Sequence, residues 1–196
     1  MPVQTKRKPL RVGFDLDGVL LYNPFCSLRP VTHALSHIKK KSKSPSFYVP
    51  KHAFTRFVWR LIHYTSIYAA VSMDSFHVFC KKNNIEPYVV TARFRCLTSL
   101  FERWKSKYHA DTIFKACYQN LYDQQPHLFK AQKINELQLD YYVEDNWSIV
   151  QHLNTHTKAK VFWVANPLDK SLISYPYRFD DLQSALEAIV QDSPHE

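Results

Sequence analysis

Five short runs of the sequence have the hydrophobic pattern of β-strands. The first run alternates apolar and polar positions, which is typical of an extended segment with two different faces. The other four are compact and rich in β-branched and aromatic residues, as expected for buried strands. The five runs cover residues 10–16, 88–91, 112–117, 141–143 and 160–165.

Segments with helical periodicity separate the later strands. They cover residues 96–108, 130–137 and 147–153, and a last helix is expected over residues 180–190. Each of the first three is about long enough to connect two parallel strands. This alternation predicts an α/β fold, a Rossmann-like parallel sheet with helices on both faces.

The connection between the first two strands is much longer than one crossover requires. It holds a basic stretch at residues 39–46, expected to be an exposed loop, and a helical stretch at residues 52–70. Apolar residues recur at helical spacing in this helix, and we expect the stripe to pack in a core. The stripe consists of Phe54, Phe57, Val58, Leu61, Ile62 and Tyr68. The sequence thus predicts an α/β core (1–22 and 74–196) and a small, basic, mostly helical cap (23–73).

Glycine is scarce, and this excludes several common binding motifs. The chain has two glycines in 196 residues, Gly13 and Gly18, where average usage of about 7% would give about fourteen. A dinucleotide-binding fingerprint needs three glycines, and a nucleophile elbow needs two around a serine. The spacing fits a Walker A loop, but Val19 and Leu20 stand where Lys and Ser or Thr are required.

Charge is distributed unevenly along the chain. The formal net charge is +9, and residues 1–60 carry twelve basic residues but two acids, Asp15 and Asp17. Such asymmetry favours an anionic substrate or partner. The four cysteines lack the spacing of a disulfide framework or a zinc knuckle, and no apolar run is long enough to span a membrane. Residues 1–11 do not resemble a secretory signal, so we expect a cytoplasmic protein.

The two acids of this basic region follow the first strand, in the run GFDLDG at residues 13–18. In open α/β sheets, ligands bind at the carboxyl ends of the strands. A spacing of two places Asp15 and Asp17 on the same side of an extended chain. One carboxylate can then attack as a nucleophile while the other exchanges protons. An acidic turn or a calcium loop is the alternative, although an EF-hand loop needs a further acid at its twelfth position.

Two later segments add groups that bind phosphate. Thr91, Ala92 and Arg93 end a predicted strand, where a hydroxyl and a guanidinium can donate to phosphate oxygens. Lys130 is expected to begin a helix, where the macrodipole disfavours a cation unless an anion lies nearby. Lys133, one turn later, is the alternative lysine.

A second acidic pair, Glu144 and Asp145, follows the strand at residues 141–143. Carboxylate oxygens at a strand end suit Mg²⁺, which usually keeps water and phosphate as its other ligands. Capping of the next helix by Asp145 or Asn146 is the alternative, and both roles are compatible.

In their order along the chain, these motifs resemble those of the haloacid dehalogenase-like (HAD) superfamily, in its phosphatase branch with a cap between the first and second motifs. The resemblance covers about residues 10–23 and 74–166. It implies that Asp15 is the nucleophile and a Mg²⁺ ligand. It also implies that Asp17 is the general acid and base and gives the metal its backbone carbonyl.

The resemblance assigns roles to the later motifs as well. Thr91 and Lys130 would hold the phosphoryl oxygens, with Ala92 and Arg93 beside them, and Asp145 would bind Mg²⁺ with Glu144 in support. Dehalogenases and P-type pumps lack the second acid of the first motif, so its presence implies phosphoryl transfer.

The predicted function is therefore a Mg²⁺-dependent phosphatase that forms an aspartyl phosphate. Its substrate would be a nucleotide or another small anionic phosphate ester. The alternative is a polyanion- or nucleic-acid-binding protein on a catalytically weak scaffold, using the basic residues between 29 and 60. A zinc enzyme is disfavoured, because His33 and His37 have i, i+4 spacing but no third ligand. We also expect Gly18 to adopt a backbone conformation that other residues resist.

Overall fold

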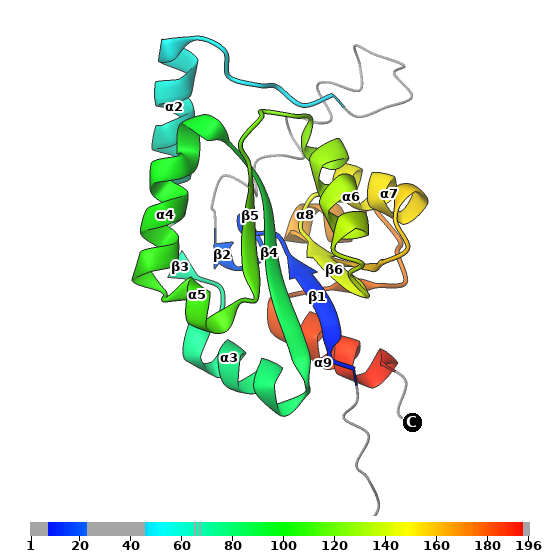
Figure 1. Ribbon diagram of the computed structural model, residues 1–196. Coiled ribbons are helices and arrows are strands. Elements are labelled where there is room, and N and C mark those ends of the chain that lie inside the picture. Colours follow the sequence, from blue (N-terminus) through cyan, green and yellow to red (C-terminus); the bar gives the residue numbers. More distant parts are fainter. Residues whose placement is uncertain (1–7, 23–45, 65, 67, 194–196) are drawn as a thin grey trace, which may run out of the picture.

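The computed structural model describes residues 8–22, 46–64, 66 and 68–193 of the chain (Figure 1). Six parallel strands form one sheet in the order β5-β4-β1-β6-β7-β8. The strands are β1 (Leu10–Phe14), β4 (Ile85–Phe94), β5 (Ala116–Asn120), β6 (Tyr141–Glu144), β7 (Lys160–Val164) and β8 (Arg178–Phe179). The chain extends the sheet from β1 first to one side and then to the other. Ligands of such sheets bind at this switch point, beyond the carboxyl ends of the strands.

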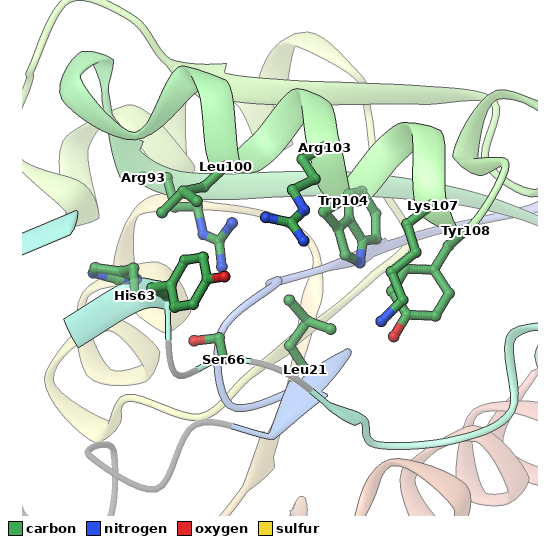
Figure 2. A pocket seen from close by; sticks show the side chains of 10 residues that line it. Leu21, His63, Ser66, Arg93, Leu100, Arg103, Trp104, Lys107 and Tyr108 are labelled. Carbon is green, nitrogen blue, oxygen red and sulfur yellow. The ribbon is translucent and has the colours of Figure 1, made fainter. Parts of the chain in front are cut away.

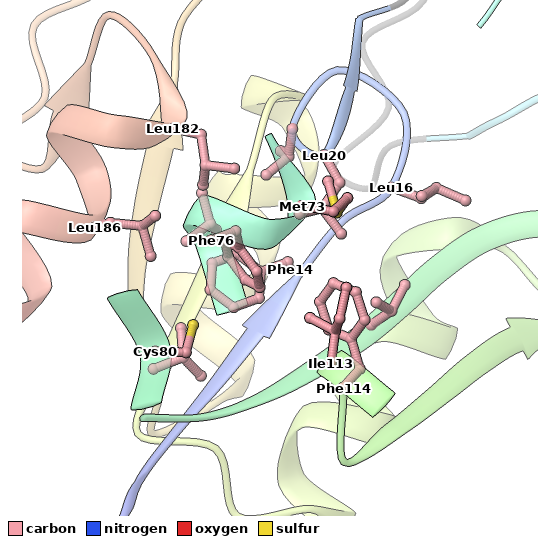
Figure 3. Packing of buried hydrophobic residues seen from close by; sticks show 14 of the residues in the cluster. Phe14, Leu16, Leu20, Met73, Phe76, Cys80, Ile113, Phe114, Leu182 and Leu186 are labelled. Carbon is pink, nitrogen blue, oxygen red and sulfur yellow. The ribbon is translucent and has the colours of Figure 1, made fainter. Parts of the chain in front are cut away.

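Helices cover both faces of the sheet, as predicted. Successive residues of a buried strand point to opposite faces, and Val89 and Val90 accordingly belong to two different hydrophobic clusters. One cluster packs against α3, α4, α5 and α9, and there the rings of Phe14 and Phe76 meet edge to face at 5.2 Å (Figure 3). The other packs against α6 and α7. The helices are α3 (Met73–Lys82), α4 (Thr98–Lys107), α5 (Ala110–Ile113), α6 (Pro126–Glu136), α7 (Trp147–His156), α8 (Pro167–Lys170) and α9 (Leu182–Asp192).

The segment expected to form a cap is only partly described. Its described elements are α2 (Ala53–Tyr64) and β3 (Tyr68–Ala69). β3 pairs antiparallel with β2 (Leu21–Tyr22), which comes just before the segment. Residues 23–45, which include His33, His37 and most of the basic stretch, lie outside the described residues.

The prediction that the aromatic stripe of this segment packs in a core is wrong. No residue of α2 is buried, and the side chains of Phe54 and Phe57 are 75% and 64% exposed. Helical spacing identifies an amphipathic face, but it does not say what covers that face. The helix is instead held near α4 by Arg60, whose Nε donates to the carbonyl of Cys96 at 2.8 Å.

Several element boundaries also differ from the predictions. The helix expected over residues 52–70 ends at Tyr64, and β3 follows it. The helix expected to begin at Lys130 begins at Pro126, so this lysine lies in the second turn and not at the N-terminus. Proline is favoured at the first helical position because its missing N–H would have no partner there. The strand expected over residues 112–117 begins only at Ala116, because the first two of these positions belong to α5 and the next two connect α5 to the strand. Among the described residues, no helix is long and apolar enough to cross a membrane.

Candidate active site

The carboxyl ends of three adjacent strands bring the first, second and fourth sequence motifs together. Phe14, at the end of β1, is in register with Val89 of β4 and with Val143 of β6. The next residue, Asp15, is fixed by its backbone N–H, which donates to the carbonyl of Val143 at 3.0 Å. Both Asp15 and Glu144, which ends β6, are buried. Two acids that are far apart in the sequence thus meet at the switch point of the sheet.

Lys130 lies between these two carboxylates. Its Nζ is 2.9 Å from Oδ2 of Asp15 and 2.6 Å from Oε2 of Glu144, and its side chain is 1% exposed. Burial alone would lower the pKa of this lysine, but the two carboxylates raise it, so Lys130 remains a cation. Helix α6 supplies the lysine from its second turn, so its ammonium group is balanced by acids and not by a helix terminus.

The other candidate lysine points elsewhere. Lys133 pairs with Glu136 at 2.5 Å on the exposed side of the same helix. Of the two lysines that the sequence left open, the geometry brings Lys130 to the acidic cluster.

Three carboxylates form a group that can hold a cation. One oxygen each from Asp15, Glu144 and Asp145 lie within 4.8 Å of one another. Burial is the main cause of a raised pKa for Asp15 and for Glu144, the latter to about 8; Asp145 adds to both shifts and Lys130 opposes them. With three acids beside one lysine in a buried place, full ionisation of the carboxylates is unfavourable unless a further cation is bound. The donors are all carboxylate oxygens, which fit Mg²⁺.

Gly18 is required where the chain passes this acidic group. Its φ is +89°, a left-handed conformation that glycine adopts at little cost, as expected from the sequence. A Cβ atom at this position would lie 2.2 Å from Oδ2 of Asp145. The turn is also tied by the N–H of Gly18, which donates to the carbonyl of Leu21 at 2.8 Å. The glycine therefore allows the turn and leaves space for an acidic side chain.

Asp17 lies outside this group and has its own partners. Arg93 donates to both of its oxygens, from Nε to Oδ2 and from Nη2 to Oδ1, each at 2.7 Å. Ser66 donates from Oγ to Oδ1 at 2.9 Å, and Nδ1 of His63 lies 3.4 Å from Oδ2. Burial would raise the pKa of Asp17, but Arg93 and His63 outweigh it and hold the pKa well below its usual value.

This arrangement gives Arg93 a partner that the sequence did not indicate. The guanidinium was expected beside a phosphate, and it instead binds a carboxylate of the first motif. His63 and Ser66 were not predicted at all. They come from the inserted segment, and no spacing links them to the strand-end motifs, so only the tertiary fold identifies them.

Thr91 and Ala92 lie where β4 leaves its regular pairing with β5. The register shifts between Thr91 and Phe94, which changes the direction of the strand end. The Thr91 side chain is buried, and its Oγ1 accepts a hydrogen bond from the backbone N–H of Arg93 at 3.3 Å. Its hydroxyl proton can therefore be donated to another group.

Comparisons with known proteins identify the fold. No protein-family model and no curated protein sequence matches the chain. Among solved structures, a haloacid dehalogenase-like hydrolase from Streptococcus pneumoniae has a TM-score of 0.59 at 10% identity, over 93% of this chain and 99% of that chain. A predicted phosphatase from Clostridium acetobutylicum has a TM-score of 0.62 at 10% identity, over 94% of this chain and 100% of that chain.

A third similar structure is a mutant of CbbY from Rhodobacter sphaeroides in complex with xylulose-1,5-bisphosphate. Its TM-score is 0.54 at 11% identity, over 89% of this chain and 95% of that chain. Identities this low establish a common fold, and they confirm the resemblance expected from the sequence at that level. The chain has the fold of the haloacid dehalogenase-like hydrolases.

Proposed function

We propose that this protein is a Mg²⁺-dependent phosphatase that forms an aspartyl phosphate on Asp15. One observation carries the proposal: Lys130 bridges Asp15 and Glu144 at 2.9 and 2.6 Å, at the carboxyl edge of the sheet. A buried nucleophile beside a lysine and two further acids suits a phosphoryl group and a metal ion together.

The acidic group is the proposed metal site. Asp15 and Asp145 would hold Mg²⁺, with Glu144 in support and the backbone carbonyl of Asp17 as a further ligand. Bound there, Mg²⁺ would offset the negative charge of the phosphoryl oxygens. Burial and the neighbouring carboxylates raise the pKa values of Asp15 and Glu144, and a bound cation would offset this cost of ionisation, which supports the assignment.

The proposed reaction has two displacement steps. A carboxylate oxygen of Asp15 attacks the phosphorus, the bond to the ester oxygen breaks, and the departing oxygen takes a proton from Asp17. Water then gives a proton back to Asp17 and attacks the phosphorus, which releases inorganic phosphate and restores Asp15. Lys130 and the hydroxyl of Thr91 would donate to the phosphoryl oxygens, where negative charge develops.

We further propose a small phosphorylated substrate, a nucleotide or another small anionic phosphate ester, and action in the cytoplasm. One similar structure contains a sugar bisphosphate, which supports a small substrate. The alternative of polyanion binding depends on basic residues between 29 and 60, many of which lie outside the described residues. Nothing in the described part of the chain favours nucleic acid.

Hydrolysis of 4-nitrophenyl phosphate tests the proposed function. We expect activity that requires Mg²⁺ and that falls at least about 10³-fold in Asp15→Asn, because the nucleophile is lost. Asp74→Asn is the matched control, since Asp74 is exposed on α3, away from the strand ends. Activity that survives Asp15→Asn, or that EDTA does not reduce, contradicts the proposal.

A further inference from the structure

A pocket of about 190 Å³ opens beside Asp17 (Figure 2). Three of its lining residues, His63, Ser66 and Arg93, also contact the Asp17 carboxylate. In the proposed reaction, Asp17 gives its proton to the departing oxygen of the substrate. The pocket therefore begins where the leaving group of a phosphate ester would lie.

One face of helix α4 forms a wall of this pocket. Leu100, Arg103, Trp104 and Lys107 all line it, and their i, i+3, i+4 and i+7 spacing places them on the same side of the helix. Figure 2 shows the guanidinium of Arg103, the indole nitrogen of Trp104 and the ammonium of Lys107 directed from α4 into the pocket. All three are hydrogen-bond donors without an acceptor atom.

The indole N–H of Trp104 lacks a hydrogen-bond partner at this pocket, within the part of the chain that the structure describes. Its side chain is 4% exposed, and its Nε1–H is buried without a hydrogen-bond partner among the described residues. Buried polar groups in folded proteins almost always have a partner. Because the indole N–H can only donate, the missing partner is an acceptor such as an oxygen of a bound molecule.

The charge of the pocket specifies what kind of acceptor fits. No carboxylate is among the lining residues, and within the described part of the chain neither Arg103 nor Lys107 forms an ion pair. Arg93 differs, because Asp17 neutralises it. Lys105 of the same helix also differs, since it pairs with Glu102 at 2.8 Å. Two cations and one buried N–H therefore face the same space.

We propose that this pocket binds a second anionic group of the substrate, and that the preferred substrates are phosphate esters that carry a carboxylate or a second phosphate on the leaving group. This inference rests on the proposed function, because it assigns the leaving-group side of the same site. Arg103 and Lys107 supply the charge, and Trp104 supplies a directed hydrogen bond. Leu21 and Leu100 provide apolar contact for the part of the substrate between its two anionic ends.

Matched substrate pairs test this inference. We expect kcat/KM for 4-carboxyphenyl phosphate to exceed that for phenyl phosphate about tenfold or more, the effect of one charge-assisted hydrogen bond. Glucose 1,6-bisphosphate against glucose 6-phosphate tests a second phosphate in the same way. A preference in the first pair alone identifies a carboxylate, and a preference in the second pair alone identifies a phosphate. Ratios near one in both pairs overturn the inference.

Single variants test whether Trp104 and Lys107 cause the preference for a second anionic group. Trp104→Phe removes the N–H and keeps an aromatic ring, and Lys107→Met removes one charge; we expect each to reduce the wild-type ratio several-fold. Lys105→Met is the control from the same helix and should leave the ratio unchanged. A ratio does not depend on the fraction of enzyme that folds. A preference that persists undiminished in both Trp104→Phe and Lys107→Met overturns the inference.

A binding measurement separates this inference from the proposed function. Calorimetry with Asp15→Asn, which cannot form the aspartyl phosphate, compares the affinities for phenyl phosphate and 4-carboxyphenyl phosphate. Tighter binding of the second compound that is lost when Trp104→Phe is added supports the pocket, even if no ester is hydrolysed. Equal affinities overturn the inference that the pocket binds an anionic group. They do not bear on the phosphatase proposal, which hydrolysis of 4-nitrophenyl phosphate tests.

Discussion

Arg93 holds the carboxylate of Asp17 with two parallel hydrogen bonds of 2.7 Å each. Both side chains are buried, at 4% and 5% exposure. A guanidinium in this geometry stabilises the ionised carboxylate strongly. The residue proposed to donate a proton is thus held as an anion in this structure. The pKa at which Asp17 takes up a proton therefore depends on Arg93.

Replacing Arg93 should change the pH dependence of the reaction. In Arg93→Gln the positive charge is lost, so the pKa of Asp17 rises and its protonated form persists to higher pH. We expect the alkaline decline of kcat with an alkyl phosphate to move to higher pH. Arg95→Gln is the control, because Arg95 is exposed at the end of the same strand. Identical pH profiles for wild type and Arg93→Gln would show that Arg93 does not set the pKa of Asp17.

Loss of Lys130 should destabilise the protein as well as inactivate it. Lys130→Met leaves Asp15 and Glu144 buried without their cation, which typically costs about 3–5 kcal/mol in the free energy of unfolding. Lys133→Met, which breaks the surface pair with Glu136, should cost less than about 1 kcal/mol. Urea unfolding of both variants measures the difference. Equal effects would mean that the buried lysine does not balance the acidic cluster.

The two glycines should respond differently to alanine. In Gly18→Ala the new Cβ meets Asp145 at a positive φ, so we expect a loss of about 1–3 kcal/mol and weaker Mg²⁺ binding. In Gly13→Ala the Cβ meets the side chains of Leu139 and Tyr142, so we expect a similar loss of stability with Mg²⁺ binding retained. Calorimetric titration of both variants with Mg²⁺ checks this. Unchanged Mg²⁺ affinity in Gly18→Ala would contradict the role given to the turn.

Stabilisation by Mg²⁺ should increase with pH. Without metal, burial raises the pKa of Glu144 in the folded protein to about 8, against an ordinary value of 4.5 in the unfolded chain. The folded state then binds more protons than the unfolded state, so this group makes the metal-free protein less stable as pH rises through that window. Mg²⁺ held beside Glu144 would lower the pKa of this carboxyl and favour its ionised form. We expect a larger rise in Tm on adding Mg²⁺ at pH 8.5 than at pH 6, and an equal or smaller rise would contradict the assignment.

The strand-end chemistry could be predicted from the sequence because local patterns determine it. A buried strand followed by two acids at a spacing of two fixes the place of Asp15, and the order of strands and helices fixes which ends meet. The lysine remained ambiguous, since Lys130 and Lys133 lie on one helix and only its rotation about its axis decides between them. The start of that helix at Pro126 was missed for a different reason, because a helix boundary depends on only a few residues.

Other parts of the site depend on contacts that no local pattern encodes. The bond between Arg93 and Asp17 joins residues 76 positions apart in the chain. The exposed aromatic residues of α2 have the spacing of a buried helix, so the sequence pattern predicted the wrong environment. Trp104 and Lys107 have ordinary helical spacing, and only the folded structure places them in the same pocket as Arg93, which binds Asp17.

The proposed mechanism requires a covalent intermediate on Asp15, and acid quenching during turnover of a ³²P-labelled phosphate ester detects it. We expect protein-bound label that requires Mg²⁺, maps to the peptide containing Asp15, and is absent from Asp15→Asn. The label should also be released by hydroxylamine, which cleaves acyl phosphates. Steady hydrolysis with no protein-bound label in the wild type, or equal labelling of Asp15→Asn, would contradict it.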